Sequence, residues 1–185
     1  MGQLREIAAG QHSKLADPAP DDDERAPGSA ATEAEQAARE IVLRKLTAQD
    51  RSRHELAKAL AQKEVPEGVA GAVLDRMEEV GLVDDAALAE SWVRSRQARR
   101  YLSKRALRQE LTRKGIDAEQ IDQALDQVEP DDEYAAALAL AEKRLRSMTG
   151  LDRQVRYRRL AGALSRRGFS AGVTSRVLSE VLEDR

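Results

Sequence analysis

The sequence of 185 residues contains no cysteine and no asparagine, and aromatic residues make up only 3% of it. Without cysteine the chain forms neither a disulfide nor a thiol nucleophile, and a reducing cytoplasm is its simplest setting. The two histidines are too few for a multi-histidine metal site. No stretch approaches the roughly 18 apolar residues of a membrane-spanning helix, and the first residues lack the pattern of a secretory signal. We therefore expect a cytoplasmic protein without membrane contact.

Familiar catalytic and nucleotide-binding motifs are missing as well. The chain has no GxxxxGK[ST], GxGxxG, GxSxG or HExxH sequence. The carboxylate pairs Asp84-Asp85 and Asp131-Asp132 stand where helices are expected to begin, and acidic side chains stabilise the helix dipole there. The sequence therefore predicts a binding protein and not an enzyme, with no catalytic residue, no metal and no cofactor.

The residues that are abundant favour helices. Ala, Leu, Arg and Glu dominate, hydrophobic residues make up 41% of the chain, and charged residues make up 35%. Between Asp84 and Val128 apolar residues recur three or four positions apart, which is the spacing of one helix face. This stretch predicts three helices, at about 85–100, 103–114 and 118–128. Gly115 would end the second of them and Asp117 would cap the third.

The same three-helix unit occurs three times. Two leucines of its second helix recur without a gap, 51 and then a further 53 residues later: Leu56 and Leu60, Leu107 and Leu111, Leu160 and Leu164. The triplets that end this helix recur as well, each with a basic residue, a helix end and an apolar residue: 63–65, 114–116 and 167–169. The pattern predicts an all-α fold, an elongated array of three tandem three-helix repeats.

The boundaries of the array are predicted from composition and capping motifs. Residues 1–31 contain prolines and the acidic run 21–24, and we expect a disordered, solvated tail. Order is expected to begin at Thr32-Glu33-Ala34-Glu35, which has the form of a capping box. The three units are expected at 32–83, 84–130 and 131–185. Because only a few residues join them, neighbouring units should touch.

Basic residues are concentrated in two segments, although the net charge of the chain is only −2. Residues 92–114 hold nine basic residues and one acid, and residues 142–168 hold nine and two. The segments occupy matching parts of the second and third units and suit a partner with repeating negative charge. The residues predicted to bind such a partner are Arg94, Arg96, Arg99, Arg100, Lys104, Arg105, Arg108, Arg153, Arg156 and Arg159.

Three of these arginines continue an apolar helix face. Steps of four residues lead from Leu88 through Trp92 to Arg96 and Arg100, and Arg99 lies on the same side. Either this helix projects past its own core towards a partner, or the arginine stems cover the core while their charged ends stay in water. The sequence leaves both interpretations open.

Short motifs in the middle unit point to a known family. They are Asp84-Asp85-Ala86, Leu88-Ala89-Glu90, Trp92-Val93-Arg94-Ser95-Arg96, Leu107-Arg108-Gln109-Glu110-Leu111 and Lys114-Gly115-Ile116. With them the chain resembles the RecX regulators of bacterial homologous recombination. The outer units match this family more loosely, in 43–46 and 167–169. The family usually has Arg-Phe where this chain has Ala87-Leu88.

The resemblance implies a fold, a partner and an activity. RecX proteins are bent all-α arrays that bind the RecA filament on DNA, in its helical groove. They inhibit strand exchange, ATP hydrolysis and the co-protease role of RecA, and they have no catalytic site of their own. For this chain we therefore expect a monomer whose partner is the RecA filament, with single- or double-stranded DNA as a further contact, acting in DNA repair and the SOS response.

Two other functions remain open at this stage. The first is a free-standing DNA-binding protein whose three-helix units act as helix-turn-helix modules. Against it, the chain has no asparagine, and arginine alone supplies phosphate affinity without a choice of sequence. The second is a scaffold that binds only protein, with basic faces that keep it in solution.

Overall fold

The computed structural model describes residues 27–183, which form nine helices and no strand. The helices are α1 (Pro27–Ala48), α2 (Arg53–Ala61), α3 (Glu67–Glu79), α4 (Asp85–Arg100), α5 (Lys104–Arg113), α6 (Ala118–Asp126), α7 (Pro130–Leu145), α8 (Arg153–Arg166) and α9 (Ala171–Glu183). Each set of three consecutive helices packs around its own cluster of buried apolar side chains. The predicted all-α array of three tandem three-helix repeats is confirmed.

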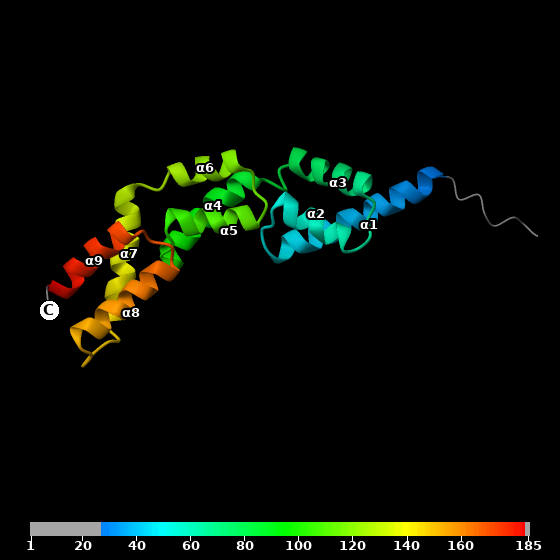
Figure 1. Cartoon of the computed structure of the whole chain (residues 1–185). Helices are drawn as coiled ribbons and strands as arrows, with labels where there is room; N and C mark the ends of the chain where they lie inside the picture. Colours follow the sequence, from blue (N-terminus) through cyan, green and yellow to red (C-terminus); the bar gives the residue numbers. More distant parts are fainter. Residues whose placement is uncertain (1–26, 184–185) are drawn as a thin grey trace, which may run out of the picture.

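The units follow one another in an elongated, bent array (Figure 1). The extensive helix–helix packing lies within the units, for example between α4 and α6 and between α7 and α9. The third unit turns away from the line of the first two, and the bend lies where α7 leaves the second unit (Figure 1). Neighbouring units therefore meet through small contacts, which decide how the array is shaped.

The second helix of each unit carries the repeated core. All six repeated leucines are 0% exposed: Leu56, Leu60, Leu107, Leu111, Leu160 and Leu164. Each of these helices ends in the same way, with a residue at positive φ followed by an apolar residue whose N–H donates back to the last core leucine. The positive-φ residues are Glu64, Gly115 and Gly168, and the N–H donors are Val65, Ile116 and Phe169, at N···O distances of 3.2, 3.3 and 3.3 Å.

The predicted start of the first helix was wrong. α1 begins at Pro27, so the last five residues of the predicted tail, 27–31, are helical, and Thr32 lies inside the helix instead of capping it. Proline suits the first turn of a helix, where its missing N–H has no partner in any case, and the alanines that follow favour helix. The rest of the predicted tail, residues 1–26, lies outside the described residues.

Two joints of similar design connect the units. In the first joint the Ser52 hydroxyl, at the N-terminus of α2, donates to the carbonyl of Lys114 at the end of α5, with an O···O distance of 2.5 Å. In the second joint the Ser103 N–H, at the N-terminus of α5, donates to the carbonyl of Arg167 at the end of α8, at 3.1 Å. Both serines are fully buried. The start of α2 thus lies against the end of α5, and the start of α5 lies against the end of α8.

Glycine is required where the two helices of a joint meet. A Cβ atom on Gly115 would lie 2.3 Å from Cγ of His54, and one on Gly168 would lie 2.4 Å from the hydroxyl oxygen of Ser103. Both glycines also have φ near the left-handed region, at +74° and +88°. The corresponding residue of the first unit is Glu64, which is exposed and has no other unit of residues 27–183 against it. Close approach between units, in addition to φ, explains glycine at these two positions.

Candidate nucleic-acid interface

Trp92 forms the centre of a charged network between α4, α5 and the first joint. Its indole N–H donates to the Glu110 carboxylate at 2.8 Å, and the Arg96 Nε donates to the same oxygen at 3.1 Å. The Arg96 guanidinium lies 3.9 Å from the centre of the Trp92 ring, and the Lys114 ammonium lies 4.4 Å from it. Arg96 is therefore bound within its own chain, which supports for this residue the interpretation that its stem covers the core.

The network continues to the capping box of α2. The Lys114 ammonium donates to the Glu55 carboxylate at 2.8 Å, and the same carboxylate accepts the Ser52 N–H at 3.1 Å. Burial alone would raise the pKa of Glu55, but the bonds from Lys114 and Ser52 outweigh it and lower this pKa below its ordinary value. Nearby, burial raises the pKa of Asp85, although this carboxylate accepts the Arg53 N–H at 2.9 Å.

Most of the other predicted binding residues are free to meet a partner. Arg94 pairs with Glu90 and Arg108 with Asp122, both at the exposed surface. Arg156 is half-buried, and its Nε is buried without a hydrogen-bond partner among the described residues. The rest form no ion pair with any residue in the range 27–183: Arg99, Arg100, Lys104, Arg105, Arg153 and Arg159.

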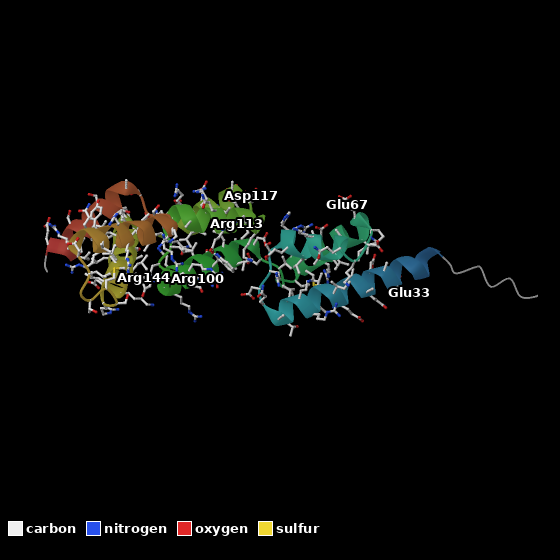
Figure 2. The ribbon with its side chains drawn as sticks, turned by 60° about the horizontal axis from the view of Figure 1, so that its bottom comes forward. Glu33, Glu67, Arg100, Arg113, Asp117 and Arg144 are labelled. Atoms are coloured by element: carbon white, nitrogen blue, oxygen red, sulfur yellow. The ribbon has the colours of Figure 1, made fainter. Side chains whose placement is uncertain are left out.

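A groove at the junction of the second and third units gathers further arginines. This junction groove has a volume of about 380 Å³ and is lined by Arg113 of α5, Arg144 of α7, and Arg166 and Arg167 at the end of α8. Figure 2 labels Arg113 on the second unit and Arg144 on the third, with Glu33 and Glu67 on the first unit. The predicted binding residues do not include these four arginines, although all four lie in the two basic segments.

A repeat-based signal for the groove was present in the sequence. Arg113 and Arg166 are separated by the same 53 residues as the core leucines, so they occupy one position in consecutive units. What the sequence does not show is that the second joint brings the ends of α7 and α8 against α5. A larger cleft, of about 640 Å³, lies at the first joint, and Glu78, Asp84, Asp85 and Asp117 make its lining acidic. The two junctions of the array therefore differ in the sign of their charge.

Neither a cluster of metal ligands nor a membrane-spanning helix occurs among the described residues. Within residues 27–183, no three His, Asp or Glu side chains come together as a metal site requires. Every helix in the part of the chain that the structure describes is too short or too polar to span a bilayer.

Fold and charge together define a class, that of a tandem three-helix array with one basic segment in its second unit and another in its third. Family models described as the first, second and third three-helix domains of RecX match residues 38–77, 84–125 and 131–178, in this order. The chain is 48% identical to the regulatory protein RecX of Streptomyces coelicolor over 147 residues, which cover 80% of this chain and 78% of that protein. The chain therefore belongs to the RecX family of regulatory proteins.

Other relatives and solved structures agree with this assignment. The regulatory protein RecX of Thermobifida fusca is 48% identical over 157 residues, covering 84% of this chain and 85% of that protein. A crystal structure of a regulatory protein RecX superposes with a TM-score of 0.73 at 27% identity, covering 89% of this chain and 80% of the other. RecX from Lactobacillus salivarius has the same fold, with a TM-score of 0.71 at 21% identity over 83% of this chain and 99% of that one.

Proposed function

We propose that this chain binds the RecA filament on DNA and inhibits strand exchange, ATP hydrolysis and the co-protease activity of RecA. The observation that carries the proposal is the order of the three RecX domains along residues 38–178, in a bent array whose second and third units present unpaired arginines. A filament of protein on nucleic acid is a long partner with repeating negative charge. An elongated array can meet several of its subunits or phosphates at once, so that many weak contacts add up.

Inhibition by such a protein needs no catalytic group of its own. A ligand shifts a conformational equilibrium by the difference in its affinity for the two states. The filament has an active state and a state in which ATP is not hydrolysed. If the array binds the second state more tightly than the first, ATP turnover falls as more of the array binds the filament. The proposal thus describes a non-enzymatic monomer that acts in the bacterial cytoplasm, with DNA as a further contact.

Helix-turn-helix recognition of bare DNA is the less favoured function. In that motif the last helix of a three-helix unit enters the major groove and needs groups that pair with bases and phosphates. α6 carries three acidic residues and no basic residue, and α3 carries four acidic residues and one arginine. Helices of this charge are repelled by a phosphate backbone, so two of the three units cannot read DNA in this way.

The test is the ATP turnover of RecA on single-stranded DNA, measured with increasing amounts of the purified chain. We expect turnover and strand exchange to fall as the chain is added, while the chain alone hydrolyses no ATP. A Leu111→Ala variant, which should unfold the second unit, serves as the inactive control. Unchanged RecA turnover at saturating chain, with the chain shown to be folded by circular dichroism, would contradict the proposal.

A further inference from the structure

The junction groove carries positive charge that its own chain does not neutralise. Arg144, Arg166 and Arg167 form no ion pair with any residue of the described range 27–183. Arg113 is held by its Nε, which donates to the Gln109 carbonyl at 3.1 Å and leaves its charge unpaired. Four guanidinium groups around one groove repel one another, and an anion bound between them relieves that repulsion.

The one carboxylate in the lining is already engaged. Glu110 accepts the indole N–H of Trp92 and the Nε of Arg96, and its side chain is only 22% exposed. Its charge is balanced by Arg96, on the side of the network around Trp92. The groove arginines must therefore find their counter-charge outside this chain.

The groove borders one face of α5. The residues that line it from the α5 side recur three or four positions apart, as Leu102, Ala106, Gln109 and Arg113. At 1.5 Å per residue this face extends about 15 Å. The alanines in the lining, Ala106 and Ala163, leave room in the groove because their side chains are short.

The second joint holds the walls of the groove in place. Ser103 and Arg167 are bonded through their backbones, and Gly168 packs against Ser103 and Ala106 too closely to admit a Cβ atom. The backbone at the end of α8 is thus held against the start of α5, although few other contacts join the two units. Arginines on a backbone that is held in this way bind with less loss of freedom than arginines on separate flexible segments.

We infer that the junction groove binds the phosphodiester backbone of a nucleic-acid strand. Arginine pairs with phosphate through two parallel N–H···O bonds, and the groove brings four arginines together along about 15 Å of α5, where successive phosphates of one strand can meet them. The inference rests on the proposed function and deepens it, because it assigns the DNA of the filament to this groove. It also gives a role to Arg113, Arg144, Arg166 and Arg167, which the predicted binding residues do not include.

The experiment measures binding of the full chain to labelled DNA in the absence of RecA. A single-stranded oligonucleotide and the matching duplex are titrated at several salt concentrations by fluorescence anisotropy. The test variant combines Arg113→Gln, Arg144→Gln and Arg166→Gln. The control variant combines Arg44→Gln, Lys58→Gln and Lys63→Gln, which remove the same charge from exposed positions of the first unit. Arg167 is kept because its backbone forms the second joint.

The expected result is a change in the salt dependence of binding. Each phosphate contact contributes a log–log slope of about −0.7 on a single strand and about −0.9 on duplex. Loss of three contacts should therefore flatten the slope by about 2 on the single strand, or by nearly 3 on duplex, and the strand that shows the loss is the one the groove binds. The control variant should keep the slope of the unchanged chain.

Three results would overturn the inference. In the first, the unchanged chain does not bind either DNA at low salt. In the second, the test variant binds both strands with the original salt slope, so that the groove does not contact phosphates. In the third, the variant melts earlier but binds as before, so that these last-turn arginines only stabilise helix ends.

A variant that fails to fold does not end the test. In that event Arg144→Gln and Arg166→Gln are measured singly, and each should flatten the single-strand slope by about 0.7. RecA is absent from this experiment. A negative result therefore says nothing about the inhibition of RecA turnover, which its own assay tests separately.

Discussion

Glu55 shows how one side chain links the stability of a joint to pH. Its carboxylate belongs to the capping box of α2 and to the ion pair with Lys114 of the next unit. Because its pKa is lowered in the folded protein, the folded state holds the proton less tightly than the unfolded state does. The stability from this group is therefore complete above the ordinary value of 4.5 and is lost as the pH falls through and below it.

We predict that Glu55→Gln flattens the acid side of the stability profile. Free energies of unfolding from urea titrations at pH 7, 5, 4 and 3 should fall less steeply for this variant than for the unchanged chain. Asp85, whose raised pKa acts with the opposite sign, is present in both proteins, so the comparison isolates Glu55. Parallel profiles for the two proteins would show that the ion pair with Lys114 does not form in solution.

Arg96 should behave differently from its neighbours Arg99 and Arg100. Its guanidinium is stacked on Trp92 and bonded to Glu110, whereas the other two side chains are exposed. We predict that Arg96→Gln lowers the free energy of unfolding by about 1 kcal/mol and changes the emission of Trp92. The double variant Arg99→Gln, Arg100→Gln should stay within about 0.5 kcal/mol of the unchanged chain. Equal stabilities for both variants, measured by denaturation, would contradict the packed position of Arg96.

The helices themselves were largely predictable from local pattern. The range 85–100 was predicted for α4 and is observed, and the ends of α5 and α8 follow from the repeated triplets. The start of α1 was misplaced because a plausible capping box at Thr32 competes with a proline that serves equally well five residues earlier. Contacts between units are another matter. Ser52 and Lys114 are 62 residues apart, and no local period tells which side chains meet there.

The same limit applies to the arginines. The charge of the sequence predicts the two basic segments, and the helix period predicts the face on which Arg96 lies. Neither pattern shows that the Glu110 carboxylate already accepts hydrogen bonds from Trp92 and Arg96, or that Arg144 lines the same groove as α5. Those facts depend on how the units dock, which involves long-range contacts that the composition of a segment does not contain.

The second helix of each unit is the element on which its stability depends most. Leu111 is 0% exposed and packs in the cluster of the second unit with Leu107 and Ile121. We predict that Leu111→Ala lowers the free energy of unfolding by about 2–5 kcal/mol, because it leaves a cavity in a small core. A urea titration followed by circular dichroism measures the change. Leu43→Ala, at an exposed position of α1, is the matched control and should leave the midpoint nearly unchanged.

The ends of the second helices differ between the units in a way that can be tested. Gly168→Ala places a Cβ atom against Ser103 and Ala106 and forces a φ of +88° on alanine, so it should destabilise the chain by about 1–3 kcal/mol. Glu64→Gly relieves a φ of +58° where no unit is in contact, so it should stabilise the chain by up to about 1 kcal/mol. Thermal melts of the two variants should move in opposite directions.

At the scale of the whole molecule, three separate cores are joined by small contacts. Stability in such an array is a sum of unit terms and interface terms, so the units need not unfold together. Trp92 is the only tryptophan of the chain and reports on the second unit, whereas circular dichroism reports on all helices.

We predict that destabilising the third unit separates these two signals. Leu178→Ala removes a buried side chain of the third core. Part of the circular dichroism signal should then be lost at a lower urea concentration than the Trp92 fluorescence change, which should move less. Coincident transitions for this variant would mean that the second joint couples the units into one cooperative body.

The residues that a joint requires also limit how many units can be linked in this way. Each joint needs a small, buried serine on one side and a glycine on the other, as in the pairs Ser52 with Gly115 and Ser103 with Gly168. The first unit has Glu64 at the glycine position, and the third has Arg156 at the serine position, inside α8. A further unit could therefore not form the same joint at either end of the array. The residues at these two positions limit the contour length of the array, and this length limits how much of a partner the array can follow.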